Sequence, residues 1–305
     1  MAASQRARVV ASHGRHCLVE SEDGTRTLCH PRGKKNQVVV GDQVLWQHTG
    51  DEGSIERVEP RRNLFYRQDE MRTKAFAANL DQVLILLAAE PVFSESQLTR
   101  ALLAAEAEGI EALIVLNKQD LGTLFDQAWA RLEPYRRMGT TVLPLGLQQA
   151  HGLDTLRARL SGHHTLVLGP SGVGKSTLVN RLVPEAGAQT GEISRALNSG
   201  RHTTTTTTWY WLDGERHSAL IDSPGFQEFG LYQLEPMQLA PLMPDLRATL
   251  GEGCRFHNCT HRHEPGCNLL PHVGTDPAQD PLAIDAGRYR LYTELFDELA
   301  AKRSY

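Results

Sequence analysis

The sequence predicts a multi-domain protein in which a small OB-like β-barrel precedes a central α/β sheet domain and a helical C-terminal unit. Short β-rich segments alternate with Gly, Asp and Asn turns over residues 7–58, and apolar strands then alternate with helical patterns. From residue 231 onward, Pro-bounded helical segments surround a cysteine–histidine cluster. We place the domain boundaries at 1–65, 66–230 and 231–305, since 305 residues exceed the roughly 100 to 200 of a usual single domain.

Composition and charge exclude several classes of protein. With 40% hydrophobic and 22% charged residues, the chain has the makeup of a globular protein and not of a disordered, collagenous or coiled-coil one. Its formal net charge of -4 gives no overall attraction to a polyanion, so any such partner would have to meet a local basic patch.

Cysteine usage and apolar runs indicate the compartment. Three of the five cysteines lie in one short stretch, which suits a metal site better than a disulfide framework and favours a reducing environment. The first eight residues lack the apolar core of a signal peptide, and the longest apolar run, residues 83–89, is too short to cross a bilayer. We therefore expect a cytoplasmic protein without membrane contact, and no pattern calls for more than a monomer.

The N-terminal region predicts five short strands, at residues 8–10, 17–20, 25–29, 43–47 and 54–58. A closed OB-like barrel accommodates so many strands in a short segment, and such barrels often bind single-stranded nucleic acid. An SH3-like or other small barrel that serves only for packing is the alternative.

A basic segment follows the predicted barrel. Six basic residues are interleaved with Phe65 and Tyr66, namely Arg57, Arg61, Arg62, Arg67, Arg72 and Lys74. Arginine beside aromatic rings is suited to RNA, whereas a solvated linker would carry the same charges simply to remain in water. The sequence leaves both interpretations open.

A phosphate-binding loop is the strongest motif of the central domain. Residues 169–176 fit G-x-x-x-x-G-K-[ST] between a predicted strand, 165–168, and a predicted helix, 175–182. Backbone N–H groups of such a loop surround a phosphate, while the lysine neutralises β and γ oxygens and the Ser176 hydroxyl ligates Mg²⁺. The candidate GTP-binding residues of this segment are Gly169, Pro170, Ser171, Gly172, Val173, Gly174, Lys175, Ser176 and Thr177.

A second motif selects the base. Asn117, Lys118, Gln119 and Asp120 directly follow the predicted strand 112–116. A carboxylate can accept both the N1–H and N2–H groups of guanine, a pair of donors that adenine lacks, and the lysine stem can lie along the ring. The motif therefore predicts GTP, and a P-loop ATPase with a coincidental match is the alternative.

Two segments after the P-loop have the pattern of switch loops. Asp222 and Gly225 frame an Asp-Ser-Pro-Gly turn after the predicted strand 218–221, where a carboxylate can hold Mg²⁺ through water and a glycine N–H can meet the γ-phosphate. The run of six threonines at 203–208 lies where a switch loop would supply a hydroxyl to Mg²⁺. Thr203 and Thr204 are the candidates, and a strand of solvated threonines is the alternative.

The cysteine–histidine cluster predicts one structural zinc ion. Cys254, Cys259, His261 and Cys267 offer three thiolates and one imidazole within fourteen residues, which suits a closed tetrahedral site. The spacing alone also admits His257 or His263 as the imidazole ligand.

The order of these motifs is unusual. In a Ras-like GTPase the P-loop comes first and the base-reading motif last, whereas here Asn117 precedes Gly169. Such a circular permutation gives the same sheet from a chain opened at a different point, provided that the original termini were adjacent at the surface. Because the switch segments then lie nearest the C-terminal unit in sequence, we expect nucleotide state to be transmitted to that unit.

The motifs together resemble those of the circularly permuted small ribosomal subunit biogenesis GTPases, the RsgA family. The resemblance spans nearly the whole chain and rests on 117–120, 169–177, 200–204, 222–226 and the four Cys/His ligands, in that order. It implies an OB barrel, a permuted GTPase domain, a zinc domain, and GTP hydrolysis stimulated by the small ribosomal subunit during its late maturation. The implied partners are this subunit and its rRNA. Leu145-Gly146 departs from the family's usual Ser-Ala turn at the guanine O6.

The resemblance also bears on catalysis. Phe226 occupies the position after the DxxG turn where Ras-like enzymes carry a water-orienting glutamine, so another group must align the water. We expect His202, in the switch loop, to take this role when the protein docks on the ribosome. Two alternatives are a solvated loop histidine without a catalytic role and, for the whole protein, a nucleotide-gated rRNA-binding module in which hydrolysis only resets binding.

Overall fold

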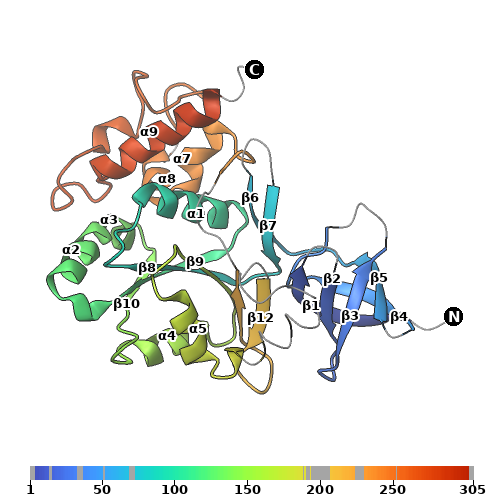
Figure 1. The fold of residues 1–305 in the computed structure, drawn as a ribbon. Coiled ribbons are helices and arrows are strands. Elements are labelled where there is room, and N and C mark those ends of the chain that lie inside the picture. Colours follow the sequence, from blue (N-terminus) through green and yellow to red (C-terminus); the bar gives the residue numbers. More distant parts are fainter. Residues whose placement is uncertain are drawn as a thin grey trace.

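The protein consists of a barrel, a central sheet domain and a C-terminal helical unit arranged around one continuous sheet (Figure 1). The structure is a computed structural model and describes residues 4–13, 16–32, 37–50, 52–68, 73–187, 189, 193, 207–223, 230–251 and 253–301. Of the helices within these residues, none combines the length and hydrophobicity needed to span a bilayer.

Five strands form the N-terminal barrel. They are β1 (Gln5–His13), β2 (His16–Glu20), β3 (Arg26–Pro31), β4 (Gln43–Thr49) and β5 (Glu52–Val58). Their order is β1-β2-β3-β5-β4, a β1–β4 pairing closes the ring, and β3 runs parallel to β5. Alternate residues fill the interior, and Val9, Trp46 and Ile55 are at most 1% exposed. The predicted OB-like barrel is confirmed.

The basic segment after the barrel is a β-hairpin. Strands β6 (Leu64–Gln68) and β7 (Thr73–Ala78) pair antiparallel, and the buried Phe65 packs against Phe76 with ring centroids 5.7 Å apart. Arg61 forms a 2.7 Å ion pair with the buried Asp42 of the barrel. Phe65 is therefore not available as a platform for an RNA base, because it lies in the core of the hairpin.

Six strands form the central sheet, in the order β10-β9-β8-β11-β13-β12. They are β8 (Gln82–Ala88), β9 (Glu111–Asn117), β10 (Thr141–Pro144), β11 (His164–Leu168), β12 (Thr207–Trp211) and β13 (Ala219–Asp222). All neighbours are parallel except β12, which runs antiparallel to β13. Every residue of β8 is buried, as expected for a strand covered on both faces.

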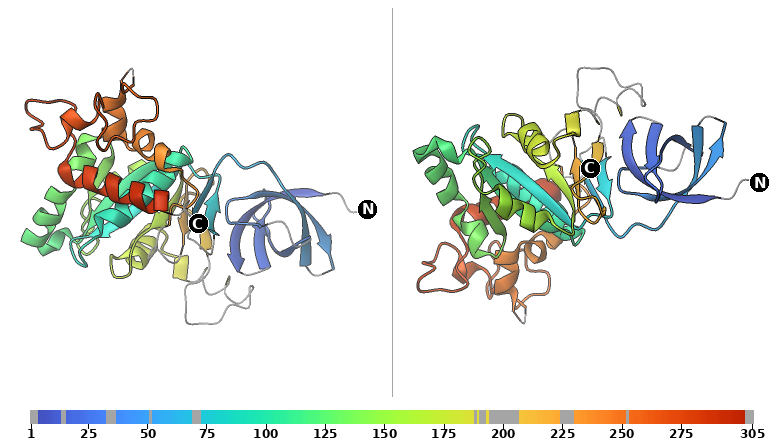
Figure 2. Two further views of the ribbon diagram at one scale, coloured as in Figure 1. Left: turned by 90° about the horizontal axis from the view of Figure 1, so that it is seen from above. Right: turned by 90° about the horizontal axis from the view of Figure 1, so that it is seen from below.

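Helices cover both faces of this sheet (Figure 2). They are α1 (Glu95–Ala107), α2 (Thr123–Arg131), α3 (Glu133–Arg137), α4 (Leu153–Leu160) and α5 (Lys175–Leu182), with a short turn η1 (Gln119–Leu121) before α2. Residues of α1, α2 and α3 share one apolar core with the C-terminal unit, whereas α4 and α5 pack on the opposite face. The predicted α/β domain is therefore confirmed.

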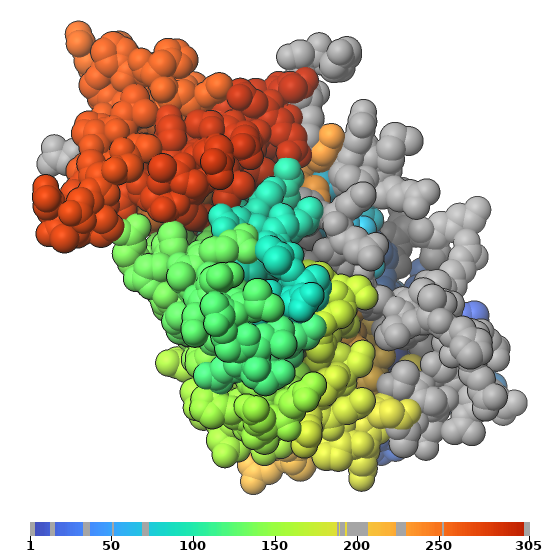
Figure 3. Space-filling view, turned by 60° about the vertical axis from the view of Figure 1, so that its left-hand side comes forward, coloured from blue at the N-terminus to red at the C-terminus, as the bar shows by residue number. Residues whose placement is uncertain are grey.

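The C-terminal unit lies on the α1 side of the sheet, where it covers the central helices (Figure 3). Its elements are η2 (Pro236–Gln238), α7 (Leu239–Leu242), α8 (Pro244–Leu250), η3 (Leu270–His272) and α9 (Ala286–Ala301). The buried Arg288 of α9 donates to both carboxylate oxygens of Asp245, at 2.9 and 3.0 Å, and to Thr99 of α1 at 3.0 Å. This fully bonded guanidinium fastens the unit to the central domain.

The barrel is joined to the central sheet through a backbone seam. Strand β1 pairs antiparallel with β12, with Ala11 opposite Thr208 and Ser12 opposite Thr207, so that one eleven-stranded sheet crosses both domains. No sequence pattern indicates this pairing. Antiparallel pairing fixes the barrel against the edge of the sheet through main-chain hydrogen bonds.

An arginine reinforces the seam. The Arg8 guanidinium lies 4.5 Å from the ring centroid of Trp209 and 5.1 Å from that of Trp211, and 3.4 Å from Nε2 of His164. Burial, and then the charge of Arg8, lowers the pKa of His164 to about 4. The imidazole is therefore neutral at pH 7, so that Arg8 contacts two indole faces and an uncharged ring.

We expect Arg8→Ala to lower the free energy of unfolding by about 1 to 3 kcal/mol, because two cation–π contacts are lost at a half-buried site. Arg6→Ala is the matched control on the same strand, because the Arg6 side chain is 71% exposed and its one ion pair within the described residues is with Glu59. Its expected effect is below about 0.5 kcal/mol. Urea unfolding of both variants tests this. Equal losses of the free energy of unfolding would contradict a stabilising contribution of Arg8 to the seam.

Candidate functional site

The predicted motifs meet at one edge of the central sheet. In the parallel register, Val167 of β11 pairs with Asp222 of β13, and Ala88 of β8 pairs with Asn117 of β9. The carboxyl ends of parallel strands lie together, so the loops after β9, β11 and β13 converge there. Chain order does not affect this convergence.

Close backbone contacts shape the P-loop. A Cβ atom on Gly169 would lie 2.8 Å from the Leu86 carbonyl oxygen, and one on Gly174 would lie 2.6 Å from Nδ2 of Asn117. Gly174 also has a φ of +99°, which disfavours any side chain. The buried Val173 anchors the loop, and α5 begins at the next residue after Gly174. The exposed members are Ser171, Gly172, Ser176 and Thr177.

The P-loop lysine meets the carboxylate predicted to serve Mg²⁺. Lys175 Nζ forms an ion pair with Asp222 and donates to the Ser223 carbonyl oxygen at 3.1 Å. The buried Ser223 hydroxyl is 3.2 Å from Oγ1 of Thr207, at the start of β12. Three segments distant in sequence therefore enclose one charged, mostly buried pair.

Asn117 links the P-loop to the base-reading loop. Its Nδ2 donates to the Val173 carbonyl oxygen at 2.8 Å, and its Oδ1 accepts from the Leu147 N–H at 3.3 Å. The side chain is buried, so both bonds are shielded from water. The motif was recognised from sequence, but this bridging contact was not, because it depends on the juxtaposition of three loops.

The rest of the base-reading motif extends from this anchor. Lys118 has the left-handed backbone conformation, with a φ of +67°, and its ammonium donates to the Glu90 carbonyl oxygen. The Gln119 N–H donates to the Leu145 carbonyl oxygen at 3.1 Å, and the Asp120 carboxylate is exposed. Asp120 is therefore accessible to a ligand while its neighbours hold the loop.

The turn at Leu145-Gly146 is also fixed within the protein. Leu145 is fully buried, and the Gly146 N–H donates to the His151 carbonyl oxygen at 3.0 Å. The sequence identified this turn as a departure from the family pattern, and its main-chain N–H is already bonded.

Several candidate residues lie outside the described part of the chain. These are His202, Thr203, Thr204 and Gly225. The last two threonines of the run, Thr207 and Thr208, belong to β12 and are buried. The alternative of a threonine strand is therefore correct for these two residues, although they are not solvated.

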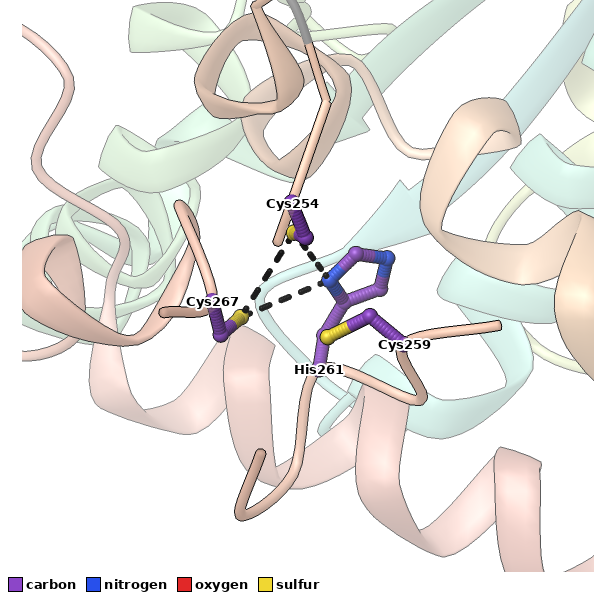
Figure 4. Close-up of side chains that lie close together, drawn as sticks. All are labelled: Cys254, Cys259, His261 and Cys267. Carbon is purple, nitrogen blue, oxygen red and sulfur yellow. Dashed lines mark hydrogen bonds between the residues drawn. The ribbon is translucent and has the colours of Figure 1, made fainter. Parts of the chain in front are cut away.

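The four predicted metal ligands form a compact cluster (Figure 4). Nδ1 of His261 lies 3.5 Å from the sulfur atoms of Cys254 and of Cys267, and these two sulfur atoms are 4.0 Å apart. All four ligand atoms, including that of Cys259, lie within 4.8 Å of one another. Ligand atoms at the usual zinc bond lengths in a tetrahedron are about 3.5 to 3.8 Å apart, so the cluster fits such an ion.

The surrounding contacts select His261 among the three histidines. His257 and His263 are exposed, whereas the His261 carbonyl oxygen accepts from the Tyr289 hydroxyl of α9 at 2.9 Å. Sequence reasoning missed Glu264, whose carboxylate accepts from Thr260 and from nearby N–H groups. Burial opposes the charge, but these hydrogen bonds prevail and lower the pKa of Glu264, which therefore organises the loop as an anion.

The strand order, the P-loop and the preceding base-reading loop define a circularly permuted P-loop GTPase. Comparisons with known proteins agree. The RsgA GTPase family model matches residues 58–232, which is more than half of the chain, and the protein belongs to this family.

Curated relatives match over nearly the full length. "Small ribosomal subunit biogenesis GTPase RsgA" of Variovorax paradoxus is 63% identical over 297 residues, covering 97% of this chain and 92% of the relative. The protein of the same name from Bordetella pertussis is 52% identical over 300 residues, covering 97% of each chain.

Solved structures support the fold. YjeQ from Thermotoga maritima aligns with a TM-score of 0.71 and 28% identity, covering 98% of this chain and 99% of the other. YloQ, described as a circularly permuted GTPase, aligns with a TM-score of 0.71 at 24% identity, covering 98% and 96% of the two chains. The second likeness concerns the fold alone.

We expect Asn117→Ala to lower the free energy of unfolding by about 1 to 3 kcal/mol, because it leaves a buried carbonyl and a buried N–H unpaired. Gln119→Ala is the matched control, since the side-chain oxygen of Gln119 has no hydrogen-bond partner within the described residues. Chemical denaturation of both variants measures the difference. A smaller loss for Asn117→Ala than for Gln119→Ala would contradict the bridging role.

Proposed function

We propose that the protein binds the small ribosomal subunit during late maturation and that the subunit stimulates its hydrolysis of GTP. The observation that carries the GTP part of this proposal is the Asn117 bridge, which connects a P-loop with the predicted guanine-reading loop despite the permuted order. The names of the curated relatives support the ribosomal partner. This partner also supports a cytoplasmic location.

The GTP-binding residues follow from the converging loops. The exposed Asp120 accepts from the N1–H and N2–H groups of guanine, and the Lys118 stem covers the ring. The N–H groups of 169–177 surround the phosphates at the start of α5, and Gly225 contributes an N–H to the γ-phosphate.

Magnesium would be held by Ser176 and by Thr203 or Thr204, with Asp222 reached through water. When bound, this ion neutralises charge on the β- and γ-phosphates. Lys175 and Asp222 form an ion pair at this place. A phosphate oxygen could take the place of Asp222 beside the Lys175 ammonium, and the carboxylate would then be available to serve the metal.

The C-terminal cluster would hold one structural zinc ion. Cys254, Cys259, His261 and Cys267 provide all four ligands of a closed site, which leaves no position for a reacting water. The ion would cross-link a segment poor in regular structure, and we propose that it defines a domain of residues 231–305. The other proposed domains are 1–65 and 66–230.

One observation favours gating of RNA binding as a second function. The seam pairs Ser12 of the barrel with Thr207, which belongs to the threonine run and contacts Ser223. A change at the phosphate site would therefore reach the barrel within a few contacts. In this alternative, hydrolysis only resets the binding of rRNA.

GTP turnover with and without purified small subunits tests the proposal, with large subunits as the control. We expect slow turnover alone and stimulation by small subunits only, because a group that aligns water is then supplied or moved into place. Co-sedimentation with a non-hydrolysable GTP analogue and with GDP tests gating. Equal turnover with both subunits would contradict the proposed partner.

We propose His202 as the group that aligns the attacking water. We expect His202→Ala to lower subunit-stimulated turnover about 100-fold while GTP affinity stays normal, because an imidazole that acts on water assists only the chemical step. His217→Ala is the control, since this histidine has a 74% exposed side chain. Undiminished stimulated turnover in His202→Ala would remove the role.

A further inference from the structure

Phe256 is an aromatic side chain on the surface of the metal-binding loop. Among the described Phe, Tyr and Trp residues it is the only exposed one, with a relative exposure of 41%. It lies within the turn 254–259, between the metal ligands Cys254 and Cys259. The ring is therefore partly open to solvent at the surface of the metal-binding loop.

Local contacts fix the shape of this turn. The Cys259 N–H donates to the Phe256 carbonyl oxygen at 3.1 Å, and the Arg255 N–H donates to the Gly266 carbonyl oxygen at 3.0 Å. Gly266 has a φ of +77°, and a Cβ there would lie 2.9 Å from Cβ of Arg255. A ring on such a constrained turn loses little entropy when a partner binds.

The charge beside Phe256 is positive. The Arg255 guanidinium lies 5.5 Å from the centroid of the Phe256 ring, and no carboxylate of the described residues forms an ion pair with it. In the same unit Arg247, Arg262 and Arg288 all pair with carboxylates.

The flanking side chains complete a polar rim. His257 and Asn258 are both exposed, and the nearby Glu264 is committed to hydrogen bonds within the loop. The turn therefore presents one ring, one available cation and neutral hydrogen-bonding groups.

We propose that this turn binds an unpaired RNA base by stacking on Phe256, with Arg255 contacting the adjacent phosphate. An apolar protein partner would require a wider apolar surface, whereas a ring beside an available guanidinium matches the base and phosphate of single-stranded RNA. The inference rests on the proposed function, since it assigns a contact to rRNA of the small subunit. It adds a surface separate from the nucleotide site.

The test uses the full-length protein with two probes, purified small subunits and an oligoadenylate RNA of about ten nucleotides. We expect Phe256→Ala to weaken binding of both probes by about 5- to 150-fold, the range of one lost base stack. Phe256→Tyr keeps a ring and should retain wild-type affinity. Leu282→Ala, at a 38% exposed residue of the same unit, is the control, and zinc content is measured for every variant.

The outcomes separate the two proposals. If the zinc-loaded Phe256→Ala variant binds both probes with wild-type affinity, the stacking inference is wrong. If the variant loses subunit binding but still binds the RNA normally, the inference is also wrong, and the partner of Phe256 is a protein. If the wild-type protein binds the RNA in a Phe256-dependent way but does not bind small subunits, the proposed function is wrong instead. If Phe256→Ala loses zinc, the Arg255→Ala variant is measured instead. The magnitude of the negative slope of log affinity against log salt concentration should then decrease by about 0.7, and an unchanged slope overturns the inference.

Discussion

The parallel register of β8, β9, β11 and β13 is the constraint on which the rest of the site depends. Parallel strands place their carboxyl ends at one edge, so spatial order in the sheet decides which loops meet. Asn117 then makes this meeting specific through its bonds to Val173 and Leu147. The permuted chain order is compatible with one site because neither the register nor this bridge depends on where the chain begins.

Features that depend on short sequence segments were predicted well. The five barrel strands, the P-loop between a strand and a helix, and the cysteine spacing each specify local geometry within a few residues. Contacts between distant segments were not predicted. The sequence leaves Phe65 as a possible RNA contact, because its burial depends on packing against Phe76. The seam between β1 and β12 could not be predicted, because no sequence pattern relates Arg8 to Trp209.

The same division applies within the candidate site. Residue types and spacing indicated Lys175, Asp222 and Asp120, but the ion pair between the first two follows only from the register of β11 and β13. The choice of His261 over its neighbours depends on how the loop turns beneath α9, where Tyr289 holds the His261 carbonyl oxygen. The roles of residues 202–204 remain predictions, because these residues lie outside the described ranges.

The two flanking units are attached to the central domain in physically different ways, and this bears on signalling. The sequence order suggested that nucleotide state is transmitted to the C-terminal unit. That unit is fastened to α1 through the hydrogen bond that Arg288 donates to Thr99, whereas the barrel pairs by main-chain bonds with β12, whose first residue contacts Ser223 beside Lys175. Lys175 of the P-loop is therefore connected to the barrel through a few contacts between described residues, and transmission of nucleotide state to the C-terminal unit stays a prediction.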